Sequence, residues 1–343
     1  MKLAIIGMNP YYESDRILYE ALQKGHEAVF LSKRRIVETN FFDKGKFGIF
    51  FSVPTREEQL FSKENFPNQE LLKLNPEQSY APEKEIRTLL GGNSNKRISN
   101  LFDINYFDAF IFREISKTLE WSTILANYLL SHKKTVVDEK IGSEMYYKSK
   151  HGTFYKTSLS GFPYAKTFAI TSKSMLLSML EHVAYPIIVK KSESSKGKGV
   201  YKCTTKVEVL ALLEQENLKV GELLFQECVD YRGDIRVIVV GDKILGAMRR
   251  EPQPGQWKGN VAQGANAYPI EISEEVKKLA LDVVKLQNAE MRGVDIMLPK
   301  SGPVLIETNS APQFKGFESS TGVNVGKEIV EYLEQKHEKL SHN

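Results

Sequence analysis

The chain has 343 residues, of which 41% are hydrophobic and 26% are charged. This composition is that of a folded globular protein, and the length suggests two or three domains. Lys and Arg number 47 against 43 Asp and Glu, a balance too mild to favour a nucleic-acid partner. No apolar run reaches the ~18 residues of a membrane span, so we expect no membrane partner either.

The N-terminal part predicts a parallel α/β domain. Residues 2–7 form an apolar run typical of a buried strand, and residues 15–24 form an amphipathic helix that Ser14 would cap and Gly25 would end. A second strand at 28–31 completes a β-α-β unit, which indicates a parallel sheet. Gly7 is not followed by a GxGxxG pattern, so the dinucleotide fingerprint is absent.

Residues 55–100 are polar and contain several prolines, and we interpret them as an insertion or long loop. The sheet then resumes with a strand at 106–113, a helix at 119–131 and a strand at 135–137. The two cysteines, Cys203 and Cys228, form no CxxC pair, which favours free thiols over a disulfide. The N-terminal apolar run is too short for a signal peptide, so we expect a cytoplasmic protein.

Strands and helices alternate from residue 148 onward. The patterns predict helices at 172–182, 205–218 and 273–287 and a last helix from about 325, with strands at 186–190 and 223–229. Residues 235–240 and 243–248 predict a hairpin that turns at Gly241 and Asp242. Thr205 and Glu208 have the spacing of a capping box at the start of their helix.

The segment GVDIMLPKSGPVLIETNSAP, residues 293–312, places oxygen-bearing side chains inside an apolar hairpin. Glu307 and Asn309 are two apart, so they share one face of a strand, and the turn brings Asp295 opposite Glu307. Burying carboxylates is costly unless they are paired or bind a metal. The hairpin alone leaves two readings open, a Mg²⁺ site or a structural cluster with a nearby Lys or Arg.

The segment YPIIVKKSESSKGKGVYK, residues 185–202, reads as a strand, a loop of Ser, Lys and Gly, and a second strand. Backbone N–H groups, hydroxyls and ammonium groups in such a loop suit a polyphosphate, although a solvated hairpin tip fits as well. The P-loop pattern and the protein-kinase motifs are absent.

These segments in this order resemble the ATP-grasp superfamily, and within it the RimK-type glutamate ligases. The matching stretches are VKKSESSKGKGV, FQECVDYRGDIRVIVVGDKILGAMRRE, GVDIMLPKSGPVLIETNSAP and TGVNVGKEI, and the resemblance runs over residues 148–327. It implies an α/β chain with α+β subdomains, in which a nucleotide-fold-like parallel-sheet domain at 1–140 precedes an ATP-grasp domain at 141–343. The small subdomain would cover about 150–228 and the large one about 229–335.

The resemblance implies ATP binding between the two subdomains. Lys148 and Lys190 match the two lysines that contact the phosphates, and Lys150 lies close enough for a register slip to exchange it with Lys148. The remaining matches cover the phosphates, hold adenine through the backbone, or lie near the ribose and phosphates. They are Glu193, Ser194, Ser195, Lys196 and Gly197 in the loop, then Gln226, Glu227, Cys228 and Val229, then Asp234, Lys258 and Asn260.

Asp295, Glu307 and Asn309 match the family's Mg²⁺ ligands; two ions are expected, and Mn²⁺ can substitute. The implied reaction joins a carboxylate to an amine through an acylphosphate and releases ADP and phosphate. Arg236 and Arg249, with Asn260, match residues that act on the reacting groups, and Arg113 matches an arginine of the N-terminal domain. A surface salt bridge is the alternative for Arg113.

The partners implied are an amino-acid donor, glutamate ahead of others, and an amine-bearing peptide, protein or small-molecule acceptor; a homo-oligomer stays open. This chain has Lys258 where near relatives have Arg, and Gln313 where they have Gly, and both positions face the acceptor side. The acceptor of those relatives therefore does not carry over. A catalytically silent ATP- and Mg²⁺-binding regulatory protein of the same fold is the second hypothesis.

Overall fold

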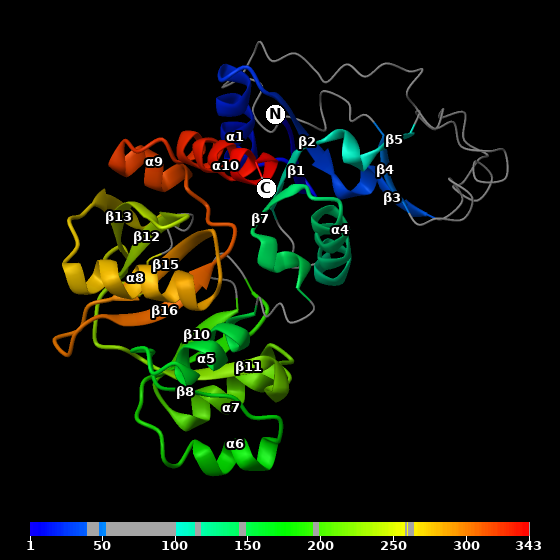
Figure 1. The fold of residues 1–343 in the computed structure, drawn as a ribbon. Coiled ribbons are helices and arrows are strands. Elements are labelled where there is room, and N and C mark those ends of the chain that lie inside the picture. The colour runs from blue at the N-terminus through cyan, green and yellow to red at the C-terminus, as the bar shows by residue number, and fades with distance from the viewer. Residues whose placement is uncertain are drawn as a thin grey trace. The chain divides into compact units, whose positions relative to one another are not determined.

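The computed structural model describes residues 1–39, 48–52, 101–113, 118–143, 149–194, 199–257, 259 and 264–342. The chain forms two compact units, Met1–Tyr146 with Asn324–Asn343, and Tyr147–Val323 (Figure 1). The predicted insertion at 55–100 lies outside the described residues. None of the described helices has both the length and the apolar character that crossing a membrane requires.

A parallel sheet forms the centre of the first unit, as the β-α-β pattern predicts. Its order is β2-β1-β6-β7 and every pairing is parallel. The strands are β1 (Lys2–Gly7), β2 (Glu27–Ser32), β6 (Ala109–Phe112) and β7 (Thr135–Val137), and the helices are α1 (Tyr12–Gln23), α4 (Leu119–Ser131) and α10 (Val325–Ser341). Helix α4 and strand β7 have the predicted bounds. Helix α1 begins three residues before the predicted start, and Ser14 lies buried in its first turn rather than capping it.

A smaller antiparallel sheet, ordered β3-β4-β5, completes this unit. Its strands are β3 (Ile36–Thr39), β4 (Gly48–Ser52) and β5 (Leu101–Asp103), and the short 3-10 helices are η1 (Lys33–Arg35), η4 (Ile104–Tyr106) and η6 (Glu139–Gly142). Phe51 and Phe107 pack together in the core of this unit, with ring centroids 5.0 Å apart and ring planes tilted by 42°.

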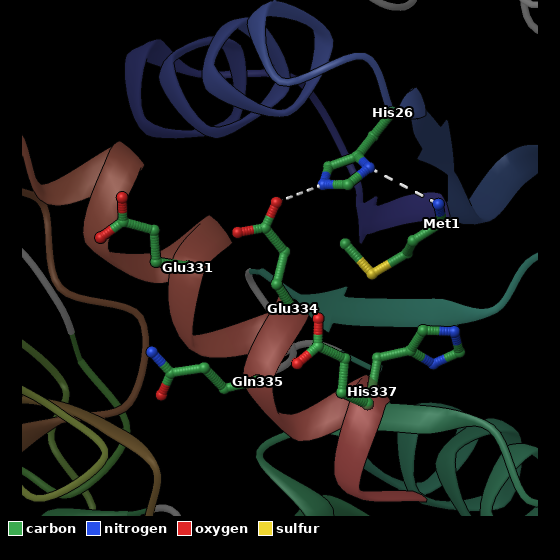
Figure 2. Close-up of a pocket in the computed structure, with 7 residues that line it drawn as sticks. Met1, His26, Glu331, Glu334, Gln335 and His337 are labelled. Carbon is green, nitrogen blue, oxygen red and sulfur yellow. Dashed lines mark hydrogen bonds and ion pairs between the residues drawn. The ribbon is translucent and has the colours of Figure 1, made fainter. Parts of the chain in front are cut away.

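The last helix, α10, packs in the N-terminal unit, which differs from the expected division at residue 140. Lys24 and His26 each bond the Glu334 carboxylate at 2.7 Å, and Lys336 Nζ donates to the Val136 carbonyl at 2.8 Å. Figure 2 shows His26 between the Met1 amino group and Glu334, beside a pocket of about 440 Å³. These charged contacts lie between segments that are 200 residues or more apart, so a boundary placed by composition alone misses them.

Two antiparallel sheets form the second unit. The first, ordered β10-β9-β11-β8, packs against the helices α6 and α7 around a shared apolar core. The elements of this part of the chain are α5 (Lys150–Leu159), β8 (Thr167–Phe168), α6 (Lys173–Met179), β9 (Ile187–Lys191), β10 (Val200–Cys203), α7 (Lys206–Gln215), η7 (Val220–Glu222) and β11 (Leu223–Glu227). The hydroxyl of Thr205 caps α7 by accepting from the Glu208 N–H, whereas the Glu208 carboxylate accepts from Thr204 N–H instead of closing the predicted box. Cys203 and Cys228 are free thiols.

The second sheet of this unit is ordered β14-β13-β12-β15-β16. Its elements are β12 (Asp234–Val240), β13 (Lys243–Glu251), β14 (Asn266–Pro269), α8 (Glu274–Leu286), β15 (Met291–Met297), β16 (Val304–Asn309) and α9 (Lys315–Thr321). Helix α8 lies along one face of the sheet (Figure 1). Its apolar stripe, which includes Leu279 and Val283, packs against Val237 and Val294. The opposite face is therefore the one on which polar side chains can gather.

Candidate active site

Six polar side chains lie on one face of the five-stranded sheet, opposite the face that α8 covers. Directly opposed residues in neighbouring strands point to the same face. Arg236 lies opposite Asp295, which lies opposite Glu307, so the predicted pairing across the hairpin is confirmed. We call the set the polar face. It comprises Asp234 and Arg236 on β12, Arg250 on β13, Asp295 on β15, and Glu307 and Asn309 on β16.

A bulge lets strand β16 supply both the apolar core and the polar face. Asp295 pairs with Glu307 but the next residue, Ile296, pairs with Leu305, so Ile306 is the extra residue of the bulge. Leu305 is fully buried in the core under α8. Without the extra residue, Leu305 and Glu307 would point the same way, because they are two apart. The bulge directs Glu307 to the polar face instead.

Asp295 is the most heavily bonded carboxylate of the polar face. Arg236 donates to it bidentately, from Nε to Oδ1 at 2.8 Å and from Nη2 to Oδ2 at 2.7 Å. Arg250 Nη2 lies 3.0 Å from Oδ2, and Arg250 Nε donates to Asp234 at 2.5 Å. Burial alone would raise the pKa of Asp295, but the two guanidinium groups outweigh it and lower this pKa to about 2. Asp295 is therefore ionised at any ordinary pH.

Glu307 is the more accessible of the two facing carboxylates. Its side chain is 27% exposed, against 8% for Asp295. The Asn309 amide bonds best when its nitrogen donates to Glu307 Oε1 at 3.1 Å and its oxygen accepts from Arg236 Nη2 at 3.2 Å. Lys150 Nζ lies 4.0 Å from the same Glu307 oxygen. A ligand that reaches this face would therefore meet Glu307 first.

Lys190 projects from β9 and is almost completely buried, with 7% of its surface exposed. Its ammonium group donates to Gln226 Oε1 at 2.5 Å, and Gln226 Nε2 donates to the Thr167 hydroxyl at 2.9 Å. Burial lowers the pKa of Lys190 to about 8, although the nearby Glu307 acts in the opposite direction. Burial together with Glu307 raises the pKa of Tyr164 well above its usual range. Lys190 is thus held close to its protonation midpoint at neutral to mildly basic pH.

Lys150 joins the site, whereas Lys148 lies outside the described residues. The Lys150 ammonium donates to the Ser194 carbonyl at 2.5 Å and lies 3.2 Å from its hydroxyl. Lys150 is the first residue of α5, so this contact joins the start of the helix to the beginning of the predicted phosphate loop. The sequence points to Lys150 only because a slip in register could exchange it with Lys148.

The other residues expected to contact ATP fall into two groups. Ser195, Lys196, Gly197, Lys258 and Asn260 lie outside the described residues. Glu193 and Ser194 follow β9, and Gln226 and Glu227 end β11. The Glu227 carboxylate accepts from Lys166 N–H at 2.8 Å, and Cys228 and Val229 continue as irregular chain towards β12.

Arg249 lies on the opposite face of the sheet from Arg236. It is paired with Ile235, its Nε donates to Glu251 at 2.7 Å, and its guanidinium lies 4.8 Å from the centre of the Tyr231 ring. The structure therefore does not bring Arg249 together with Arg236, and Arg250 takes that place. A bulge causes the difference. Val240 pairs with Lys243 as a two-residue hairpin requires, but Val239 pairs with Ile244 and Ile238 with Gly246, so the register beyond is shifted by one residue.

Arg113 follows β6 in the first unit and is buried, with 5% of its surface exposed. The surface salt bridge considered as an alternative is therefore wrong for this residue. Its backbone N–H donates to the Ile6 carbonyl at 2.7 Å, which holds it at the carboxyl end of the parallel sheet. Lys33 and Asp138, also buried, follow the neighbouring strands β2 and β7 at the same edge. Ligands of open α/β sheets commonly bind at this edge.

The residues at Asp295, Glu307 and Asn309 fit a magnesium ion. Two carboxylates and one amide are hard oxygen donors of the kind that Mg²⁺ takes. Among the described residues, no group of three His, Cys, Asp or Glu side chains is placed to hold a metal, so an ion here also needs the Asn309 amide and ligand oxygens. The salt-bridge cluster considered as an alternative is present, because Asp295 bonds two arginines. A carboxylate has about four acceptor positions, so these bonds leave room for an ion.

Charge at the site favours an anion. Three carboxylates, those of Asp234, Asp295 and Glu307, face four cationic groups. The cationic groups are Arg236 and Arg250 with Lys190 and Lys150. The group carries one net positive charge when Lys190 is protonated. A polyphosphate that brings its own divalent cation is compatible with such a balance.

Known proteins resemble this chain in sequence over about half of its length. A probable alpha-L-glutamate ligase of Pseudomonas fluorescens strain SBW25 is 36% identical over 152 residues, which cover 44% of this chain and 50% of the relative. A probable alpha-L-glutamate ligase of Legionella pneumophila strain Corby is 31% identical over 160 residues, which cover 46% and 53%. The chain thus spans about half the length of these curated relatives.

Solved structures show the same fold over nearly the whole chain. The ATP-grasp ligase PsnB, in complex with minimal precursor, Mg and ADP, aligns with a TM-score of 0.62 at 16% identity and 98% coverage of each chain. A RimK domain protein from Sphaerobacter thermophilus aligns with a TM-score of 0.61 at 15% identity, covering 97% of this chain and 99% of that one. The profile of the RimK-like ATP-grasp domain matches residues 147–333. Because this match covers more than half of the chain, the protein belongs to the RimK-like ATP-grasp family.

Proposed function

We propose that the protein is an ATP-dependent carboxylate–amine ligase that forms an amide or peptide bond through an acylphosphate. The observation that carries this proposal is the polar face, where Asp295, Glu307 and Asn309 meet Arg236 and Arg250 on one side of a sheet. Family membership supports it, and the curated relatives are named as glutamate ligases.

ATP is proposed to bind with its phosphates between Lys190 and the start of α5. Lys190 and Lys150 supply compact positive charges, and Lys148 stays the family's match for the second lysine. The chain from Gln226 to Val229 would hold adenine through its backbone. Because the Gln226 side chain is occupied by Lys190 and Thr167, its proposed role is to orient the lysine rather than to contact the base.

The magnesium ions are proposed to bind Asp295, Glu307 and Asn309. When bound, such ions neutralise charge on transferring phosphates; two ions, and replacement by Mn²⁺, are part of the proposal. The role of this chain is to hold the three oxygen donors in place. Asp295 stays ionised because Arg236 and Arg250 lower its pKa.

The bond-forming steps then follow from the chemistry of the two substrates. An oxygen of the donor carboxylate attacks the γ-phosphorus of ATP, ADP leaves, and an acylphosphate forms. The amine attacks the acyl carbon and loses a proton, and phosphate leaves with the electron pair of the broken C–O bond. Charge on the reacting oxygens is proposed to meet Arg236 and Arg250, which are fixed before the reaction by their bonds to Asp295 and Asp234.

Glutamate is the proposed donor, and a peptide, protein or small amine is the proposed acceptor. The names of the curated relatives support glutamate, and solved structures of the same fold hold precursor peptides, as in MdnC with MdnA from Microcystis aeruginosa. Arg113, at the carboxyl edge of the first unit's sheet, stays a proposed donor contact. Lys258 stays a proposed ATP contact, and Asn260 stays a proposed catalytic residue near the phosphates. A cytoplasmic location is also part of the proposal.

A screen of phosphate release tests the proposal. The protein is incubated with ATP and Mg²⁺ and with each amino acid, singly and then with candidate amine acceptors, and the products are identified by mass spectrometry. The proposal predicts phosphate release that depends on glutamate and a product that is lighter than its two substrates together by one water. Tight ATP binding without release under any condition would support the silent regulatory protein instead.

A further inference from the structure

A row of hydrogen-bonded polar side chains lies behind strand β16, on the face away from Glu307 and Asn309. Thr308, between those two residues, points to this opposite face. Its hydroxyl lies 2.9 Å from Gln287 Nε2 and 3.2 Å from Gln287 Oε1. The hydroxyl also lies 3.5 Å from that of Thr153 on α5. A single hydroxyl therefore contacts the residue that ends α8 and the helix that carries Lys150.

Arg292 sets the direction of the hydrogen bonds in this row of polar side chains. It is 4% exposed, and its Nε donates to Gln287 Oε1 at 3.0 Å, while its Nη1 donates to the Met291 carbonyl at 2.7 Å. A guanidinium only donates, so it fixes the amide of Gln287 with the oxygen towards Arg292 and the nitrogen towards Thr308. Thr308 then accepts from Gln287 Nε2 at 2.9 Å, and its own proton faces Gln287 Oε1 at 3.2 Å and the Thr153 hydroxyl at 3.5 Å.

Strand β16 needs such support because it is the edge of its sheet. Among the described residues, the outer side of β16 is bridged only at Leu305, which pairs with Tyr164 and whose N–H donates to the Pro163 carbonyl at 2.7 Å. The segment from Glu307 to Asn309 follows the bulge at Ile306, where ladder pairing is locally disrupted. Its inner side is held by β15, and the Thr308 hydroxyl is the contact that ties it to two helices.

We propose that Thr308 is a positioning residue for the metal-binding side chains, acting through the backbone of β16. The inference rests on the proposed function, because it takes Glu307 and Asn309 as ligands of a divalent cation. The Thr308 hydroxyl holds the strand after the bulge, so Glu307 and Asn309 keep their spacing from Asp295. Groups that orient metal ligands typically change metal affinity by about 10–100-fold when they are removed.

The test compares Thr308→Val with Thr308→Ser. Valine has nearly the shape of threonine but lacks the hydroxyl, whereas serine keeps the hydroxyl and loses a methyl group. Binding of Mn²⁺ is measured by the loss of the free-ion electron paramagnetic resonance signal, with a non-hydrolysable ATP analogue present. This readout needs no turnover. We expect Mn²⁺ affinity to fall about tenfold in Thr308→Val and to stay near the wild-type value in Thr308→Ser.

Thr135→Val is the matched control. Thr135 is a buried strand threonine of the first unit, and its hydroxyl lies 3.1 Å from Nδ1 of His337 in the same unit. Thermal unfolding should shift by similar amounts in the two valine variants, but only Thr308→Val should lose Mn²⁺ affinity. Gln287→Met, which removes the partner outside the strand, is expected to lose affinity in the same way, so the test does not depend on one variant folding.

The outcomes separate this inference from the proposed function. Wild-type protein that binds no Mn²⁺ overturns the proposed metal site and the inference together. If the wild type binds Mn²⁺ and Thr308→Val and Gln287→Met bind it with the same affinity, the role of Thr308 is overturned and the proposed function stands. Equal losses in Thr308→Val and Thr308→Ser also overturn it, because the hydroxyl would then not be the cause.

Discussion

Replacing Lys190 with methionine should separate two opposite effects of pH on the protein. Lys190 is buried, and burial lowers its pKa from the ordinary value of 10.5 to about 8. The ammonium is the form that binds a phosphate, so raising the pH through 8 removes the charge that ATP requires. In the protein without nucleotide, the same rise in pH removes a buried charge, so the folded state should become more stable.

The sizes of both effects follow from the pKa. Between about pH 8 and 10.5 the unfolded chain holds a proton that the folded chain has lost, so the free energy of unfolding rises with pH in that window. At 1.36 kcal/mol per pKa unit, the rise is at most about 3 kcal/mol. Apparent affinity is reduced by the fraction of protein in the competent form, so from about pH 7 to pH 9 the affinity for ATP should fall about tenfold.

The assay is titration of a non-hydrolysable ATP analogue at fixed Mg²⁺ across this pH range. The affinity of the wild type for the analogue should show the tenfold fall. At pH 7, Lys190→Met should bind the analogue at least about tenfold more weakly than the wild type does, and its affinity should not fall further as the pH rises. Lys191→Met is the control. The Lys191 side chain lies against Gly199, on the face of β9 opposite to that of Lys190. Wild-type affinity that stays constant through pH 8, or an identical slope in Lys190→Met, would refute the reasoning.

Three further predictions test separate parts of the structure. Arg250→Lys should lower kcat/KM about tenfold, because a lysine lacks the planar fork with which Arg250 reaches Asp234 and Asp295 from two different nitrogens. Arg249→Lys on the other face should change it less than about twofold, and a larger loss at Arg249 would reverse the assignment. Glu307→Ala should abolish turnover of ATP while thermal unfolding shows an intact fold, and turnover at the wild-type rate would exclude Glu307 as a metal ligand. Glu334→Gln should lower the unfolding free energy by up to about 1 kcal/mol through weaker bonds to Lys24 and His26, and denaturant titration should show a smaller difference at high salt.

Sequence patterns predict the elements of this fold well and the register of its hairpins poorly. The helix at 119–131 and the strand at 135–137 have the bounds that periodicity gives. The register at the turn would pair Asp295 with Ile306, and the bulge at Ile306 puts Glu307 there instead. A two-residue hairpin at Gly241 would place Arg249 opposite Asp234. The extra residue near Gly246 puts Arg250 there instead. Gly246 is a local signal of this shift, because an isolated glycine inside a strand suggests a bulge.

Contacts between distant segments explain most of what sequence reasoning missed. The bonds from Lys24 and His26 to Glu334 join segments about 310 residues apart, so composition along the chain does not place α10 with the first unit. Lys150 enters the site because α5 begins beside Ser194, a contact set by the packing of the helix. Arg292 and Gln287 carry no motif, since their importance comes from a buried hydrogen bond behind β16.

Isotope transfer from the donor tests the central claim, formation of an acylphosphate on the donor carboxylate, most directly. Glutamate labelled with ¹⁸O in its carboxylates is incubated with the protein, ATP, Mg²⁺ and an amine acceptor, and the released phosphate is analysed by mass spectrometry. If a carboxylate oxygen attacks the γ-phosphorus, each phosphate carries one labelled oxygen from the donor. Phosphate released without label would show that water attacks ATP, and would contradict the ligase mechanism.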